Sequence, residues 1–398
     1  MLQNTFKLRI FLLFWAVNLL PLCAAAQGMK KTHNPIQVAV PILNVAPDAR
    51  GASMGDMGVA TSPDVNSQHW NAAKYPFALP KMGVGLSYVP WLAGLVSDVS
   101  VVYLSYFNRV DNNQSVSGSI RYFRLGEMAI VDDQGIQLEN VNPYECSIDV
   151  AYARKFGEHL SGSLTLRYIR SDLTGGFYAA GLGWGSVGGL SPANGFGADV
   201  GMYYQNEHVG NSYGLGWTIS NMGTKVSYSE NAEKYSLPTN LRVGGRYTYN
   251  VDEQNSFTGG LELSKLLVPT PPEIDGNRAI LMGMDNNVSV VEGMIQSFYD
   301  APYGAGEELS EVMFGFGVEY AYNNAFFARG GYFHDSKRKG NRRYLTFGAG
   351  IKYTFLTLDL SYLYPFTTND PLSNTLRVSL LFDLNVQRVR SGVNSSRE

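Results

Sequence analysis

Few residues in this sequence have the chemistry for acid–base or nucleophilic catalysis. Covalent hydrolysis needs a serine or cysteine activated by a histidine, which a third group holds in place. The chain has five histidines: His33 and His69 precede the first predicted strand, His159 and His208 lie in predicted short turns, and His334 lies near a strand end. None has a catalytic motif around it, and no His, Cys, Asp or Glu cluster has metal-ligand spacing. The sequence therefore predicts a protein that is not an enzyme and needs no metal or other cofactor.

The single cysteine beyond the N-terminal leader and the net charge exclude further functions. Cys146 falls on the apolar side of a predicted strand, where a reactive thiolate is disfavoured. The formal net charge is −3 and the longest basic run, at residues 337–343, is short, so we exclude nucleic acid as a partner. That run is typical of a solvated loop, with lipopolysaccharide phosphates of an outer membrane as the alternative contact.

The N-terminus predicts export. Lys7 and Arg9 precede an apolar run, which small residues follow up to Ala26. This order is typical of a secretory signal peptide, here residues 1–26, and the run is too short to span a bilayer as a helix. Lipidation of Cys23 is the disfavoured alternative, because a bulky leucine precedes it.

A two-residue period runs through the rest of the chain. In residues 144–171, apolar and polar side chains alternate on both sides of a short turn. The same alternation recurs at 257–266, 314–322, 345–353, 358–364 and 376–384. Since no later window carries the roughly 18 apolar residues of a transmembrane helix, an exported chain of this kind is either a soluble β-sandwich or an outer-membrane barrel.

Loop lengths favour the barrel. Alternation and turn residues predict fourteen strands, at 82–90, 98–108, 114–125, 143–156, 159–171, 194–206, 210–222, 239–250, 255–266, 310–323, 325–335, 342–354, 356–365 and 373–384. Connections after even-numbered strands are short, whereas those after odd-numbered strands are mostly long, as in bacterial outer-membrane barrels. We therefore predict an all-β fold, a transmembrane antiparallel β-barrel of about 14 strands over residues 81–384. Its long loops are extracellular, both termini are periplasmic, and residues 385–398 form a periplasmic tail.

Residues 27–80, which precede the first strand, are predicted to plug the lumen. A barrel of this size is too wide for its own side chains to fill. We expect the segment to enter from the short-turn side, with glycines allowing close backbone packing, charges pairing with the wall, and a tryptophan as apolar anchor. A mobile periplasmic tail is the alternative. The predicted plug residues are Asp48, Arg50, Gly51, Met54, Gly55, Asp56, Gly58, Asp64, Trp70 and Asn71.

Two stretches carry a family resemblance. Ala46–Phe77 resembles the N-terminal motif of the PorV proteins of the type IX secretion system, within a wider group of barrels similar to the fatty acid transporter FadL. Trp217–Tyr228 together with Leu237–Tyr247 resembles a second block of that family. The group's usual WNPA reads WNAA at residues 70–73, a departure that leaves the plug intact but changes the residue that sets its local bend.

The resemblance implies a role in protein secretion. PorV-like proteins are shuttles of the Gram-negative outer membrane. They bind the C-terminal signal domains of cargo at the Sov/SprA translocon and carry them to the attachment complex that contains the PorU sortase. No cofactor takes part in that scheme.

Apolar residues in the long loops are candidates for partner binding, because exposed apolar clusters commonly mark contacts. A predicted helix within residues 289–302 has helical apolar spacing, and its alternative role is to pack on the barrel rim or cap the lumen. The candidates are Trp91, Leu92, Leu95, Phe177, Tyr178, Trp184, Val291, Met294, Ile295 and Phe298.

Two rival functions stay open at this point. One is FadL-like transport of a hydrophobic small molecule, released sideways from an apolar pocket. The other, minor one is the lipopolysaccharide deacylase activity proposed within the family, which the isolated histidines disfavour.

Overall fold

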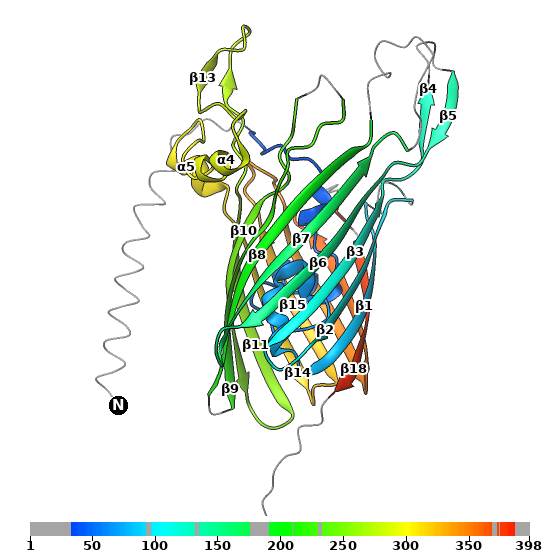
Figure 1. The fold of residues 1–398 in the computed structure, drawn as a ribbon, viewed down its shortest axis with the longest axis vertical. Coiled ribbons are helices and arrows are strands. Elements are labelled where there is room, and N and C mark those ends of the chain that lie inside the picture. The colour runs from blue at the N-terminus through cyan, green and yellow to red at the C-terminus, as the bar shows by residue number, and fades with distance from the viewer. Residues whose placement is uncertain are drawn as a thin grey trace, which may run out of the picture.

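Fourteen antiparallel strands form a closed barrel in the computed structural model, which describes residues 33–386 except 93–95, 97, 132–133, 135, 176–190, 209, 230–232, 368–371 and 374 (Figure 1). The first strand pairs with the last, Pro80 lying opposite Val386, and closes the wall. The strands are β1 (Pro80–Pro90), β2 (Ser100–Arg109), β3 (Gln114–Arg124), β6 (Tyr144–Lys155), β7 (Leu160–Asp172), β8 (Ala193–His208), β9 (Asn211–Gly223), β10 (Asn240–Asn250), β11 (Asn255–Leu266), β14 (Met313–Tyr322), β15 (Phe326–His334), β16 (Arg343–Tyr353), β17 (Leu356–Pro365) and β18 (Leu376–Val386). The predicted barrel is confirmed, and its strand ends agree within three residues, the largest difference lying at the starts of β14 and β18.

The two-residue period divides each strand between the two surfaces of the wall. In β2, Val102, Leu104 and Tyr106 are exposed on the outside, while Tyr103 and Ser105 are buried inside. An apolar outer face with a polar inner face suits a wall between lipid and lumen. No helix among the described residues is long and apolar enough to cross a membrane.

Long connections gather at one end of the barrel and carry structure of their own. A hairpin of β4 (Met128–Val131) and β5 (Gln137–Val141) extends the connection between β3 and β6. The connection between β11 and β14 contains β12 (Glu273–Ile274), β13 (Ile280–Met282), α4 (Val290–Gln296) and α5 (Ala305–Ser310). Both lie at the upper end in Figure 1, opposite the short turns. We call residues 267–312 the mouth loop.

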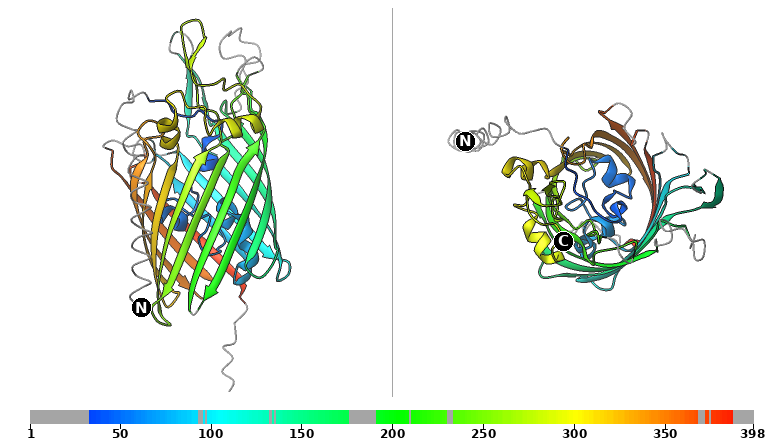
Figure 2. Two further views of the ribbon diagram at one scale, coloured as in Figure 1. Left: turned by 90° about the vertical axis from the view of Figure 1, so that its left-hand side faces the viewer. Right: turned by 90° about the horizontal axis from the view of Figure 1, so that it is seen from above.

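The N-terminal segment, residues 33–79, lies inside the ring of strands (Figure 2, right). Its elements are η1 (Pro41–Asn44), α2 (Ala49–Ser53), α3 (Ser67–Trp70) and η2 (Ala72–Phe77). Predicted signal-peptide residues 1–26 and most of the predicted tail, residues 387–398, fall outside the described residues.

The direction of this segment corrects one prediction. The Asn34 backbone N–H donates to the Arg338 carbonyl at 2.9 Å, and that of Ala39 donates to the Ser236 carbonyl at 2.9 Å. Both acceptors lie in connections at the long-loop end, so the described chain begins there and descends through the lumen to β1. The prediction that it enters from the short-turn end, with both termini at that end, is wrong for the described N-terminal end. The even number of strands and the alternation of loop lengths determine at which end of the barrel β1 starts. They do not determine the path of the residues before β1.

Candidate functional site

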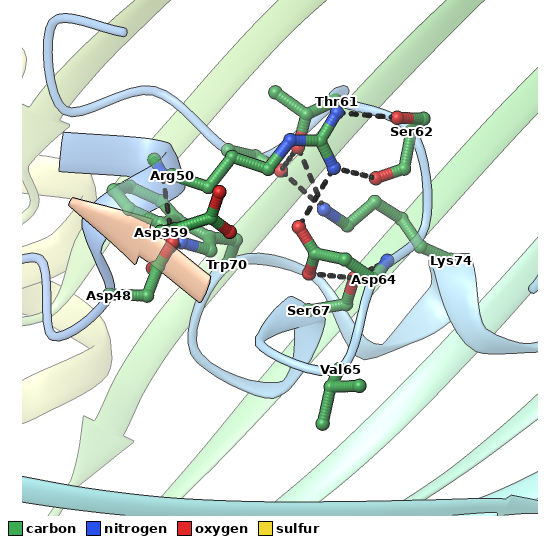
Figure 3. A network of polar contacts seen from close by, with 12 residues as sticks. Asp48, Arg50, Thr61, Ser62, Asp64, Val65, Ser67, Trp70, Lys74 and Asp359 are labelled. Carbon is green, nitrogen blue, oxygen red and sulfur yellow. Dashed lines mark hydrogen bonds and ion pairs between the residues drawn. The ribbon is translucent and has the colours of Figure 1, made fainter. Parts of the chain in front are cut away.

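Trp70 is buried within the N-terminal segment. Asp48 caps α2 by accepting from the Gly51 N–H at 2.7 Å, and its other oxygen accepts from Trp70 Nε1 at 2.7 Å (Figure 3). The indole packs against Gly51 and Gly58, where any added Cβ would overlap the ring. Gly51 and Gly58 therefore serve close packing rather than an unusual backbone conformation. Burial, with the nearby Asp64 charge, raises the pKa of Asp48 to about 6.

Arg50 joins the N-terminal segment to the wall through buried ion pairs. Its guanidinium contacts Asp64 at 2.9 Å within the segment and Glu319 of β14 at 3.1 Å. Arg329 then bridges Glu319 and Asp359, at 2.6 Å each. Charges alternate along this chain of contacts, so each buried charge has a neighbour of opposite sign. Arg50 thus pairs with Glu319 of the wall and with Asp64 of the segment, whereas Asp48 accepts hydrogen bonds within the segment.

Glu262 of β11 holds the middle of the segment. Its Oε2 accepts from the backbone N–H groups of Gly58 and Val59, at 2.8 and 2.9 Å, while Arg242 of β10 donates to its other oxygen at 2.9 Å. Asn71 donates from its amide to the carbonyls of Val59 and Met202, which adds β8 to the attachment. Strand β11 therefore binds the segment through backbone N–H groups, and β8 binds it through the Asn71 side chain.

Inward-facing glycines let the segment touch the strands directly. Gly55 has a φ of +74°, and an added Cβ would lie 2.5 Å from the Tyr332 carbonyl oxygen. On the wall, a Cβ at Gly317 or Gly331 would overlap the backbone of Met54 or Gly55. Met54 and the nearby Met57 are fully buried, and Asp56 accepts a hydrogen bond from Tyr344 of β16. Such backbone-to-backbone contact is possible only without side chains.

Two buried basic groups complete the segment. Lys74 donates to the Gly58 carbonyl at 2.8 Å and to the Thr61 hydroxyl at 3.0 Å, and no carboxylate among the described residues forms an ion pair with it. Burial lowers its pKa to about 8. His69 contacts Arg121 at 2.8 Å, and burial together with this positive neighbour holds the pKa of His69 well below its usual range.

None of the histidines with described side chains hydrogen-bonds a serine or cysteine. His33 and His159 contact backbone carbonyls, His69 contacts an arginine, and His334 contacts the Tyr332 hydroxyl. Among the described residues, no three His, Cys, Asp or Glu side chains gather as a metal site. That the protein is no enzyme and needs no cofactor stays a prediction.

The two stretches that resemble the second PorV block, Trp217–Tyr228 and Leu237–Tyr247, meet at a β-bulge. Asn221 of β9 has a φ of +60°, and its register against β8 shifts beside Asp199. Its backbone N–H donates to Asp199 at 2.7 Å, its amide donates to the Pro238 carbonyl at 3.0 Å, and its carbonyl accepts from the Thr239 hydroxyl at 2.9 Å. The two stretches of this block are thus joined through one side chain and its backbone.

The mouth loop carries part of the predicted partner-binding set. Val291, Ile295 and Phe298 are 70%, 61% and 52% exposed, while Met294 is half-buried. The predicted helix is shorter than expected: Ser289 caps its start, it ends at Gln296, and Phe298 lies beyond it.

The remaining candidates have different surroundings. Trp91 is half-buried and packs against the cluster that contains Val40 and Ile42 of the N-terminal segment, and Leu92 beside it is half-buried with a φ of +56°. These two are therefore not freely exposed. Leu95, Phe177, Tyr178 and Trp184 lie outside the described residues.

Ion pairs fix the base of the mouth loop to the barrel rim. Lys265, at the end of β11, contacts Glu311 and, at 3.2 Å, Glu308. Lys339, between β15 and β16, contacts Glu307 at 2.7 Å and Glu311 at 2.8 Å. Sequence reasoning missed these pairs because they join the end of one strand to residues from two separate connections. They attach the base of the loop to the barrel rim, while Val291, Ile295 and Phe298 of the same loop are exposed.

The fold and these contacts define a closed β-barrel of the outer-membrane kind with its own N-terminal segment in the lumen. The family model "Type IX secretion system protein PorV" matches residues 28–273, and the chain belongs to this family. The resemblance is thereby confirmed, and it places the protein in the outer membrane of a Gram-negative bacterium.

The chain is similar to several solved structures at low identity. A TodX deltaS2S3 mutant, a monoaromatic hydrocarbon channel, is 13% identical with a TM-score of 0.51, covering 85% of this chain and 98% of that one. The toluene transporter TodX of P. putida is 12% identical with a TM-score of 0.50, covering 87% and 100%. A FadL homologue of Pseudomonas aeruginosa is 9% identical with a TM-score of 0.46, covering 88% and 100%. No curated protein sequence matches.

Proposed function

We propose that this protein binds the C-terminal signal domains of secreted cargo at a Sov/SprA-type translocon and carries them to a PorU-type sortase complex at the cell surface. Membership of the PorV family supports the pathway. The observation that carries the binding role is the mouth loop, which combines a fixed base with an exposed apolar surface.

The physical reason lies in that combination. Exposure of apolar side chains such as Val291, Ile295 and Phe298 to water is unfavourable, and the free energy falls when a partner covers them. Because the ion pairs of Glu307 and Glu311 already hold the loop, little ordering entropy is lost on binding. A fixed apolar ridge suits a protein partner better than a freely moving loop does.

The proposal includes an orientation and a closed lumen. The mouth loop faces the outside of the cell and the short turns face the periplasm, as the alternation of loop lengths indicates. The N-terminal segment acts as a plug, and its hydrogen bonds to β8, β11, β14 and β16 support that role. A carrier that binds cargo on its outer face has no need of an open pore.

A triple substitution tests the binding role. We expect Val291→Ser, Ile295→Ser and Phe298→Ser together to reduce co-purification of cargo signal domains and translocon about a hundredfold, since each buried anchor contributes roughly 1 kcal/mol or more. The matched control carries Val110→Ser, Val251→Ser and Phe156→Ser, which are equally exposed but lie in short turns at the opposite end. Equal co-purification by both variants would exclude the mouth loop as the binding surface.

Transport of a hydrophobic small molecule is the second candidate. The shared fold with barrels described as hydrocarbon channels favours testing it. A transporter restores uptake of a labelled fatty acid or aromatic hydrocarbon in cells that lack the protein, and a secretion carrier instead restores surface display of cargo.

A further inference from the structure

A cavity of about 270 Å³ lies at the long-loop end of the lumen. Residues of the N-terminal segment from Pro35 to Val45 form one side, and the ends of β10, β11, β14, β15, β16 and β18 form much of the rest. Asp56, Trp91, Glu311, Leu372 and the connection between β15 and β16 complete the lining. The volume is at the lower end of ligand sites, so it suits a small group or the end of a chain rather than a folded domain. Its walls are partly apolar, with Ile36, Val38 and Phe333 among them.

Arg377 of β18 is a buried cation in this cavity, and its partner among the described residues is the Trp91 ring, whose centroid lies 6.0 Å from Cζ. Its side chain is 1% exposed, and neither Nε nor Nη1 has a hydrogen-bond partner. The other basic residues lining the cavity are paired: Arg242 with Glu262, Lys339 with Glu307, and Arg342 with Asp335. Among the described residues, no carboxylate lies within 4 Å of Arg377. A buried, uncompensated guanidinium is costly, and an incoming anion removes that cost.

The same cavity also presents acceptors that lack a donor. Asp56 uses one carboxylate oxygen to accept from the Tyr344 hydroxyl, while its other oxygen, Oδ1, is buried and unpartnered. The side-chain oxygen of Asn240 is likewise buried and unpartnered. A ligand that satisfies all of these groups must bring an anion and at least one N–H donor.

We propose that this cavity binds the C-terminal end of a polypeptide, with Arg377 pairing with the terminal carboxylate and Asp56 and Asn240 accepting from backbone N–H groups. A polypeptide end supplies both kinds of group, whereas a fatty acid supplies only the carboxylate. Apolar walls then receive the last side chain. The inference rests on the proposed function, because it assigns to this cavity the extreme end of the cargo signal domain.

Guanidinium chemistry suits this assignment. Arginine offers a planar fork of donors that matches a carboxylate with two parallel hydrogen bonds, and its charge persists at any physiological pH. Removing one partner of such a pair weakens binding by about tenfold to a hundredfold. The free carboxylate therefore determines a measurable part of the affinity.

The test uses the purified full-length barrel and a signal domain of a protein secreted by the same bacterium, made with a free or an amidated C-terminus. We expect amidation to weaken binding about tenfold or more, and Arg377→Gln to weaken binding of the free form alone, to the level of the amidated form. Arg124→Gln, on the exposed surface at the same end, is the matched control and leaves both affinities unchanged.

The possible outcomes distinguish a failure of the proposed site from a failure of the proposed function. Equal binding of free and amidated domains overturns the site while the carrier role stands, and this comparison needs no variant that has to fold. Competition by hexanoate that Arg377→Gln abolishes, with no effect of amidation, assigns the cavity to small carboxylates and overturns the proposal. Binding of neither domain form overturns both the site and the proposed function.

Discussion

Two adjacent glycines of β15 provide a direct test of how the N-terminal segment is held. Gly331 faces the lumen, where an added Cβ would overlap the backbone of Met54 and Gly55 and lie 2.8 Å from Thr346 Oγ1. Gly330 faces outward, and the nearest atom to an added Cβ is 3.9 Å away. Gly331→Ala and Gly330→Ala therefore make the same chemical change in the same strand on opposite surfaces.

The expected free energies of unfolding differ in sign. Replacing glycine by alanine stabilises a compatible site by roughly 0.4–1 kcal/mol through the unfolded state, and this is the whole effect expected at Gly330. At Gly331 an extra methyl group in a filled space costs about 1–3 kcal/mol, because backbone cannot move aside as a flexible side chain can. The Gly55 N–H bond to Thr346, 3.0 Å long, is also at risk, at about 1 kcal/mol. Together these place the two variants roughly 2–4 kcal/mol apart.

Urea unfolding in detergent micelles, followed by the shift between folded and unfolded bands on unheated gels, measures this difference. Leakage of a small solute from vesicles containing each variant tests the predicted plug, and we expect faster leakage only for Gly331→Ala. Equal unfolding midpoints for the two variants would refute the close backbone contact. A lower midpoint without added leakage would refute the plugging role alone.

Three further predictions concern charge. Glu319→Gln leaves Arg50 and Arg329 short of a buried partner, so we expect a loss of about 3 kcal/mol in urea unfolding, and an unchanged midpoint would show that the pairs contribute nothing. Because burial lowers the pKa of Lys74 to about 8, the unfolded chain holds more protons between pH 8 and 10.5; stability therefore rises with pH in that window, and Lys74→Met should abolish the rise. Burial raises the pKa of Asp300 to about 6, so the folded mouth loop holds more protons between pH 4 and 6; its protection from hydrogen exchange, corrected for intrinsic rates, should fall over that range, and persistence of this fall in Asp300→Asn would contradict the assignment.

The barrel was predictable because its signal is local. Alternation with a period of two predicts every barrel strand. The same alternation indicates which side of each strand faces lipid. The small hairpins β4–β5 and β12–β13 were missed because they are short and lack a buried face to impose alternation. For the same reason the helix at Val291 was found but drawn too long, since its exposed side carries apolar residues past the true end.

The candidate site was only partly predictable. The sequence indicates that Arg50, Gly55 and Trp70 serve a packed segment, because those residue types suit pairing, close approach and anchoring. It does not indicate that Glu319 is the partner of Arg50, or that Arg377 has no carboxylate partner among the described residues, since both facts depend on which strands face one another across the lumen. Direction within the lumen was likewise beyond reach, because either path gives the same pattern of strands.

The N-terminal segment runs from the long-loop end of the lumen to β1, and this path implies an order of assembly. The segment is made first, whereas the seam between β1 and β18 needs the last strand of the chain. Threading residues 33–79 upward through a finished cylinder would mean breaking and remaking its many attachments to the wall one after another. We therefore expect the growing sheet to form around the N-terminal segment. The segment is then enclosed when β18 pairs with β1.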